Sequence, residues 1–257
     1  MDLQIQGKTA LVAASTSGLG LAAARALAHE GARVVITGRR GAVAAQIAAE
    51  LPEAVGLAAD LNTDEGLESA MAAATDAYGP IDILVLNGPG PKPGAAAALS
   101  THDLASAFDL LVKPQHTLIS KVLPGMRKRR WGRILAIGSS GIAAPLPNLA
   151  LSNTGRAALA GYLKTLAAEV ALDAVTVNML LPGRIATDRV AELDLAAAKR
   201  RSRTVEAIQQ ESRSTIPARR YGNPSEFGAA AAFLCSGPAS YITGVALRCD
   251  GGLVRTL

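Results

Sequence analysis

A glycine-containing turn near the start of the chain is suited to binding a pyrophosphate. Residues 15–20 read Ser-Thr-Ser-Gly-Leu-Gly and lie between an apolar run at 9–13 and a helix-forming stretch at 19–30. Backbone N–H groups at a strand-to-helix junction, with the helix dipole behind them, bind phosphate oxygens, and Gly18 and Gly20 permit close approach. The expected contacts are Ser15, Ser17, Gly18, Leu19 and Gly20. A tight turn without a ligand is the alternative.

The second predicted strand, at 33–37, is followed by a pair of arginines, Arg39 and Arg40. In nucleotide-binding α/β folds an acidic residue here holds the 2′-hydroxyl of NAD(H), whereas arginine accommodates the 2′-phosphate of NADP(H). The pair therefore indicates that NADP(H) is preferred and that NAD(H) is the second choice. A pair of arginines that is merely solvated at a turn is the alternative.

Two polar residues follow the next two predicted strands. Asp60 comes after the strand at 54–59 and is placed to accept a hydrogen bond from an adenine amino group. Asn87 comes after the strand at 81–86, where it would hold the chain beside the nicotinamide ribose. Ligands of open α/β sheets bind at the carboxyl ends of the strands. The expected contacts here are Asp60, Leu61, Asn87 and Gly88.

Strand-like and helix-like segments alternate along the whole chain, the pattern of a doubly wound α/β fold. The predicted strands are 9–13, 33–37, 54–59, 81–86, 133–137, 175–180 and 245–248. The predicted helices include 19–30, 43–51, 64–78, 104–130 and 150–172. The first six strands are apolar on both faces, or nearly so, as expected of strands buried in a parallel sheet. We predict a single Rossmann-type domain over residues 1–257, with helices on both faces of the sheet.

Two features interrupt this alternation. Pro114 should kink or divide the helix at 104–130, because proline lacks a backbone donor. The segment 188–214 predicts one or two inserted amphipathic helices, bracketed by Pro182-Gly183 and Pro217 as in a hinged lid. It carries the basic run 199–203, which is either a solvated helix face or a surface that recruits an acidic substrate group, a coenzyme A phosphate or an acidic carrier protein.

These motifs resemble those of the short-chain dehydrogenase/reductase family, especially its 3-oxoacyl-[acyl-carrier-protein]-reductase-like branch, over nearly the whole chain. The family pattern Thr-Gly-x-x-x-Gly-x-Gly falls on residues 13–20, with Ala14 in place of the first glycine. Asp60 and Asn87 match the family's aspartate and asparagine at these points. Further matches are Pro182, Gly183, Thr187, 220–226, 233–236, 241–244 and 250–252. The resemblance implies that a loop with Pro182, Gly183, Ile185 and Thr187 closes over the nicotinamide.

The catalytic positions that the resemblance implies are mostly replaced. In the family a tyrosine transfers the proton, a lysine lowers its pKa, a serine holds the carbonyl oxygen and an asparagine supports a water relay. Ser139 matches the serine, whereas Ser152 and Arg156 occupy the tyrosine and lysine positions and Leu111 falls at the asparagine. Serine is a poor proton donor and arginine stays protonated, so the family's usual mechanism is not expected.

Other residues are candidates for part of this work. Arg156 is expected to donate hydrogen bonds to the nicotinamide ribose, to polarise a substrate carbonyl or to bind a carboxylate bidentately. Lys92 and His116 are the nearest titratable candidates for a replacement acid, although a lone lysine or histidine is more often solvated or structural. None of the chain's four tyrosines is followed by a lysine four residues later.

Two functions from different classes follow. The first is an atypical NADP(H)-dependent reductase acting on a small or acyl carbonyl substrate, with Ser139, Ser152 and Arg156 as catalytic residues. The second is a non-catalytic protein that uses the nucleotide pocket as a sensor or assembly element, since a fold alone does not determine function. The resemblance also implies a homo-oligomer, a tetramer, that associates through the helices at 104–130 and 150–172 and the last strand.

Composition narrows the class further. The net charge is +5, and the basic clusters lack the interleaved aromatic residues that stack on bases, so no nucleic-acid partner is expected. The two cysteines do not form a disulfide framework or a metal site, and no metal is expected. No apolar run is long enough for a membrane span, and the first strand begins too early to leave room for a signal peptide. The sequence predicts a cytoplasmic protein without a membrane partner.

Overall fold

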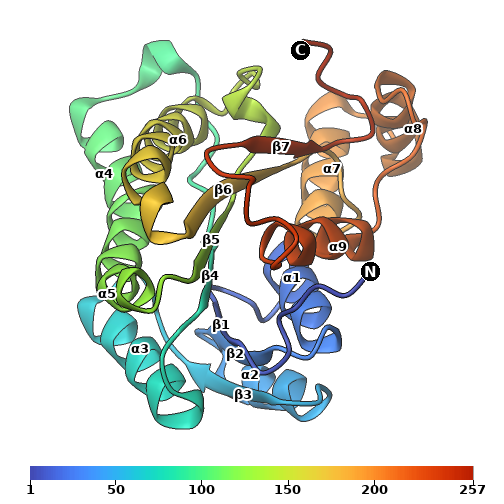
Figure 1. The fold of residues 1–257 in the computed structure, drawn as a ribbon. Helices are drawn as coiled ribbons and strands as arrows, with labels where there is room; N and C mark the ends of the chain where they lie inside the picture. The colour runs from blue at the N-terminus through green and yellow to red at the C-terminus, as the bar shows by residue number, and fades with distance from the viewer. Residues whose placement is uncertain (257) are drawn as a thin grey trace.

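The computed structural model describes residues 1–256 and shows one sheet of seven parallel strands in the order β3-β2-β1-β4-β5-β6-β7 (Figure 1). The strands are β1 (Thr9–Val12), β2 (Arg33–Gly38), β3 (Ala54–Ala58), β4 (Ile83–Leu86), β5 (Gly132–Ile137), β6 (Val175–Pro182) and β7 (Ala246–Cys249). Each strand begins and ends within two residues of its predicted bounds. Chain order reverses at β1, between β2 and β4, and in such sheets this is the point where ligands bind.

Helices cover both faces of the sheet, as predicted. One face carries α1 (Gly18–His29), α2 (Gly41–Ala49) and α9 (Pro224–Leu234), and their apolar residues form one core cluster. The other face carries α3 (Asp64–Tyr78), α5 (Lys113–Arg129) and α6 (Ala150–Val170), which form a second cluster. α4 (Thr101–Leu111) packs against α6. The central strands are buried between the clusters, which explains their apolar residues on both faces.

Two details differ from the predictions. β3 is only partly buried, because it is an edge strand with one neighbour, whereas its apolar residues predicted a fully buried one. The helix predicted at 104–130 is two helices, divided at Val112, and Pro114 lies in the first turn of α5. Proline is tolerated there because the first N–H groups of a helix have no intrahelical partner. The division is one of the two predicted outcomes.

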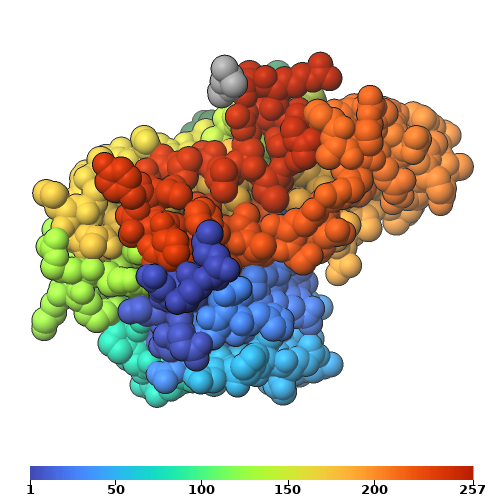
Figure 2. Space-filling view, turned by 45° about the vertical axis from the view of Figure 1, so that its right-hand side comes forward, coloured from blue at the N-terminus to red at the C-terminus, as the bar shows by residue number. Residues whose placement is uncertain are grey.

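The predicted insertion is a pair of helices, α7 (Asp188–Arg201) and α8 (Val205–Thr215), which projects from the body of the molecule (Figure 2). We call it the α7–α8 hairpin.

Both cysteines are free thiols, and burial raises the pKa of Cys235 to about 12. Within residues 1–256 no helix is long and apolar enough to cross a membrane.

Candidate active site

The turn between β1 and α1 has the backbone conformation that a phosphate site needs. Gly18 has a φ of +58°, which favours glycine, and it begins α1. The N-cap residue Ser17 is exposed and its side chain makes no capping hydrogen bond, so it leaves the first N–H groups of the helix open. The predicted contacts Ser17, Gly18 and Leu19 therefore lie at an accessible helix N-terminus, where an anion is stabilised.

Ala14 holds a left-handed conformation at the start of this turn. Its φ is +46°, in the region where a side chain costs roughly 1–2 kcal/mol. Ala14 is therefore accommodated in a conformation that favours glycine, with local strain.

A hydrogen-bond network holds the ends of β1, β2 and β4 together beneath the turn. Ser15 Oγ donates to Val12 O (2.7 Å) and accepts from Thr37 N (3.0 Å). Thr37 Oγ1 donates to Val12 O (3.0 Å) and accepts from Ala14 N (3.1 Å). Asn87 Nδ2 donates to Ala14 O (3.1 Å). We call these five residues the strand-end network.

The network corrects one predicted contact. Ser15 is completely buried, and both its hydroxyl and its backbone N–H are bonded within the protein, the latter to Thr37 O at 2.8 Å. Ser15 therefore supports the turn from below and does not face a cofactor. Thr37, which the sequence analysis did not single out, is its partner.

Gly20 should be irreplaceable for a steric reason. A Cβ at Gly20 would lie 2.6 Å from Ala14 O and 2.7 Å from Asn87 Nδ2. We expect Gly20→Ala to destabilise the protein by about 1–3 kcal/mol and to weaken NADP(H) binding, because the strand-end network must shift. Urea unfolding and calorimetric titration measure the two effects.

Gly161 provides the matched control. It lies inside α6, and a Cβ there would meet no atom within 4 Å. Gly161→Ala should stabilise the protein by up to about 1 kcal/mol through its better helix propensity. Equal effects of the two substitutions would contradict the steric role of Gly20.

The residues expected to contact the adenosine half of the cofactor include charged side chains with free hydrogen-bonding groups. Arg39 and Arg40 are exposed at the end of β2, and neither makes an ion pair within residues 1–256. Asp60 follows β3, where its Oδ1 accepts hydrogen bonds from Asn62 N (3.1 Å) and Asn62 Nδ2 (2.9 Å). Its second carboxylate oxygen has no such partner, so it can accept a bond from a ligand. Leu61 is half-buried beside it.

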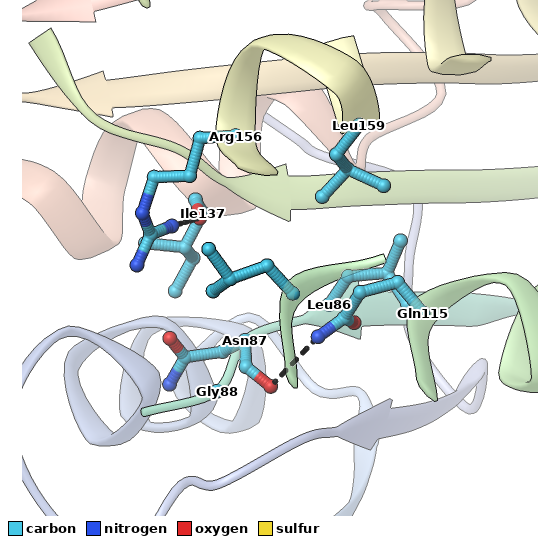
Figure 3. Close-up of a pocket in the computed structure, with 8 residues that line it drawn as sticks. Leu86, Asn87, Gly88, Gln115, Ile137, Arg156 and Leu159 are labelled. Carbon is cyan, nitrogen blue, oxygen red and sulfur yellow. Dashed lines mark hydrogen bonds between the residues drawn. The ribbon is translucent and has the colours of Figure 1, made fainter. Parts of the chain in front are cut away.

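A small cavity lies at the carboxyl ends of β4 and β5, and Figure 3 shows its lining residues. Its volume is about 10 Å³, roughly the space that one water molecule needs. The lining residues are Leu86, Asn87, Gly88, Leu111, Gln115, Ile137, Arg156 and Leu159. Arg156 is its only charged residue, and the cavity has no acidic one.

Arg156 comes from α6 and is held by the end of β5. Its Nη1 donates to Ile137 O (3.0 Å) and Gly138 O (3.3 Å). Nε and Nη2 donate to no group of residues 1–256, and neither is among the buried atoms that lack a partner, so both are accessible to solvent. We call Nε and Nη2 the open edge of Arg156. Burial lowers the pKa of the guanidinium below its ordinary value, because its charge is poorly solvated.

Ser139 is placed as a hydrogen-bond donor beside this arginine. It follows β5 directly after Gly138, and its Oγ accepts a hydrogen bond from Gly141 N (3.1 Å). Because the hydroxyl oxygen is oriented by that bond, its hydrogen is available to a substrate oxygen. Ser152 lies in the first turn of α6, half-buried, one turn before Arg156. Three predicted catalytic residues thus lie on the β5 end and the adjoining α6.

The two candidate replacement acids do not line the cavity. His116 is exposed, and its Nδ1 lies 3.0 Å from Tyr162 Oη on the outer side of α5 and α6. Lys92 is exposed on the loop after β4.

Leu111 does line the cavity, and Gln115, one turn further along the chain, supplies a polar group there. Its Nε2 makes a long contact of 3.5 Å to Asn87 O, and its buried Oε1 accepts no hydrogen bond from the protein.

The loop that carries Lys92 is tied to the segment before α6. Gly94 N donates to Asn148 O (2.9 Å) and Ala150 N donates to Gly94 O (3.2 Å), which forms an isolated parallel bridge. We call residues 88–99 the β4 loop. The bridge joins the middle of the β4 loop, two residues after Lys92, to the residues directly before Ser152.

The loop expected over the nicotinamide is anchored to the α7–α8 hairpin. Pro182 ends β6, Gly183 packs against Asp250, and Ile185 pairs with Gly222. Thr187 is the N-cap of α7, where its Oγ1 accepts a hydrogen bond from Val190 N. These residues therefore form the connection between β6 and the hairpin, and the pairing of Ile185 with Gly222 holds it to the segment before α9.

A buried carboxylate completes this connection. Asp194, on α7, is 0% exposed, and its two oxygens accept hydrogen bonds from Arg184 Nη1 (2.7 Å) and Tyr221 Oη (2.9 Å). We call these three residues the Arg184 network. The sequence analysis did not identify it. Burial raises the pKa of Tyr221, so its hydroxyl remains a donor to Asp194.

The basic run on the hairpin is paired in part, by one carboxylate. Arg201 and Arg203 both pair with Glu211 of α8, and these hydrogen bonds lower the pKa of Glu211. Two of the arginines expected to recruit an acidic ligand thus join α7 to α8 instead. Lys199 and Arg200 remain exposed.

Known proteins similar to this chain share its length and fold. Residues 13–254 match the family described as enoyl-(acyl carrier protein) reductase. The 3-oxoacyl-[acyl-carrier-protein] reductase FabG of Aquifex aeolicus is 34% identical, over 98% of this chain and 100% of that protein. L-sorbose reductase of Gluconobacter frateurii, solved with NADPH and L-sorbose, is 31% identical over 100% of both chains, with a TM-score of 0.93. A 3-ketoacyl-(acyl-carrier-protein) reductase of Brucella melitensis, solved with NADH, is 32% identical over 97% of this chain and 99% of that one, with a TM-score of 0.84.

Proposed function

This chain belongs to the short-chain dehydrogenase/reductase family of NAD(P)-dependent oxidoreductases that act on CH–OH and C=O groups, and on that premise we propose that it is an atypical, NADP(H)-dependent reductase of a small or acyl carbonyl substrate. The observation that carries the proposal is the common location of its polar groups. The open N-terminus of α1, Asn87, Ser139 and Arg156 all lie at the carboxyl ends of β1, β4 and β5.

The residues present fit a dinucleotide. The accessible N–H groups of α1 suit its pyrophosphate, and Gly20 leaves the chain close to Asn87, where a Cβ would collide. The unpaired Arg39 and Arg40 suit a 2′-phosphate. We propose Asp60, Leu61, Asn87, Gly88, Arg156, Pro182, Gly183, Ile185 and Thr187 as the remaining contacts.

The proposed chemistry uses few protein groups. When bound, NADP(H) supplies a hydride to the carbonyl carbon. Ser139 donates a hydrogen bond to the carbonyl oxygen, and the Arg156 guanidinium stabilises the negative charge that develops there. Neither side chain gives up its proton readily, so solvent water protonates the oxygen. Without a positioned general acid, we expect turnover that is about 10²–10⁴-fold slower than that of relatives with one.

Oxidation of NADPH by purified protein with a panel of aldehydes, ketones and 3-oxoacyl thioesters tests the proposal. Slow, protein-dependent turnover of at least one class supports a reductase. Tight cofactor binding without any turnover would instead support a non-catalytic sensor or assembly protein, which the replaced tyrosine and lysine positions favour. The double variant Ser152→Tyr with Arg156→Lys is the control, because it should raise turnover if the pocket is otherwise sound.

Cofactor preference provides a sharper prediction. Arg39→Asp should reverse a preference for NADPH over NADH, weakening NADPH binding about 10- to 100-fold, because a carboxylate repels the 2′-phosphate and accepts from a 2′-hydroxyl. Calorimetric titration with both cofactors measures this, and Lys128→Asp, at the opposite end of the sheet, is the control. Equal or tighter binding of NADH by the unchanged protein would refute the assignment.

We also propose a homotetramer. α4 exposes Leu104 and Phe108, the edge strand β7 exposes Leu247, and all three are apolar side chains on the elements expected to associate. Sedimentation at micromolar concentration should therefore give a species larger than a monomer. A stable monomer would contradict the proposal.

A further inference from the structure

Arg156 combines an unused pair of donors with the absence of an ion pair within residues 1–256, which distinguishes it from Arg133 and Arg184. Arg133 donates through both Nε and Nη1 to the carbonyl oxygens of Ser236, Gly132 and Ala174, and it stacks on Trp131. Arg184 is paired with the carboxylate of Asp194. Arg156, by contrast, engages the protein through Nη1 alone and makes no ion pair.

The unused donors form one edge of the guanidinium. Nε–H and one Nη2–H are parallel and spaced to meet the two oxygens of a carboxylate, the bidentate arrangement that arginine favours. Figure 3 shows this edge turned away from Ile137, whose carbonyl oxygen accepts the hydrogen bond from Nη1. The hydrogen bonds to the main-chain carbonyls of Ile137 and Gly138 fix the plane of the guanidinium. The open edge is therefore oriented before a ligand binds.

The surroundings favour an anion at this edge. Among residues 1–256 no acidic side chain lines the cavity at Arg156, and burial lowers the pKa of its guanidinium because the positive charge is poorly solvated. A ligand carboxylate would supply the missing compensation. A neutral ligand would leave the cation partly desolvated and unpaired.

The substrate carbonyl must lie close to that anion. Arg156 Nη1 donates to Gly138 O, and the next residue, Ser139, holds the hydroxyl that we assign to the carbonyl oxygen. Arg156 extends from α6 and is tied to the backbone directly before Ser139, so we expect the two side chains to reach neighbouring groups of one substrate. We propose that Arg156 binds the carboxylate of the substrate through Nε and Nη2, and that the substrates are oxo acids whose carboxylate lies one or two carbons from the carbonyl.

This inference rests on the proposed reductase function, and binding tests it separately from turnover. Oxamate has a carboxylate beside an amide carbonyl, and oxamide is its neutral counterpart. With and without saturating NADP⁺, calorimetry should detect oxamate but not oxamide. Arg156→Met should weaken oxamate binding on the order of 100-fold, and Arg156→Lys should weaken it less.

The outcomes distinguish the two proposals. Selective oxamate binding that depends on Arg156, with no reduction of any aldehyde, ketone, oxoacyl thioester or oxo acid, would contradict the reductase proposal and support the carboxylate site. Equal affinity for oxamide, no oxamate binding, or unchanged binding in Arg156→Met would overturn the carboxylate site, whatever the turnover. A crystal structure of the NADP⁺ complex in which ribose hydroxyls occupy both Nε and Nη2 would overturn it as well.

Discussion

Replacing Asp194 with alanine should lower the free energy of unfolding by about 3–5 kcal/mol, because it leaves the partners of a buried carboxylate without their acceptor. Arg184 and the Tyr221 hydroxyl both donate to Asp194. Removing the carboxylate leaves an uncompensated cation and an unpaired hydroxyl between the hairpin and the loop after β6. Urea-induced unfolding measures the loss.

Two further variants make this result specific. Leu195→Ala, next to Asp194 on α7 but 46% exposed, should change stability by less than about 0.5 kcal/mol. The combination Asp194→Leu with Arg184→Met should recover much of the loss, because an apolar pair has no unpaired charge. A loss below about 1 kcal/mol for Asp194→Ala would show that the Arg184 network does not hold the hairpin in solution.

Ser139→Ala should reduce kcat about 10²–10³-fold, the usual cost of removing one hydrogen-bond donor from a developing oxyanion. The affinity for NADPH should stay within a fewfold of that of the unchanged protein, because Ser139 is not among the proposed cofactor contacts. Steady-state kinetics and cofactor titration separate the two quantities.

Thr154→Ala is the matched control for Ser139. Thr154 lies on α6 between Ser152 and Arg156, but its side chain is exposed. The variant should leave kcat unchanged. If Ser139→Ala also retains full kcat, the oxygen of the substrate is held by another group and the assignment of Ser139 is wrong.

The elements of the fold were predictable because their signals are local. Each strand in the centre of the sheet must be apolar on both faces, and each helix must be amphipathic, so periodicity predicts both. The partial exposure of β3 was not visible in its residues. Ala54–Ala58 is apolar enough for a central strand, and only the order of strands in the sheet places it at an edge.

The buried polar residues left a signal that the sequence analysis missed. Asp194 lies four residues from Val190 and from the buried Ala198, so a carboxylate interrupts the apolar stripe of α7. Gln115 likewise interrupts the stripe of α5, which continues through Leu118 and Val122. A polar residue on the buried face of a helix requires a partner, and its presence can be recognised from helical spacing.

The identity of such partners could not be predicted. Arg184 and Tyr221 lie 10 and 27 residues from Asp194, and nothing in their spacing connects them. The same reason explains why the ion pairs of the hairpin were not predicted. The run 199–203 was interpreted as a solvated helix face or as a surface that recruits an acidic group, and neither interpretation included Glu211 of the next helix, which pairs with Arg201 and Arg203. Charge pairing depends on tertiary contacts rather than on local composition.

The bridge between Gly94 and residues 148–150 has a consequence for redesign. Substrate range in α/β enzymes is commonly altered by grafting a loop from a relative. Here the β4 loop and the segment before α6 share two backbone hydrogen bonds, so replacing one alone would leave an N–H and a C=O of the other without partners. The two loops should therefore be transplanted together, as one recombination unit, although more than 50 residues separate them in the chain.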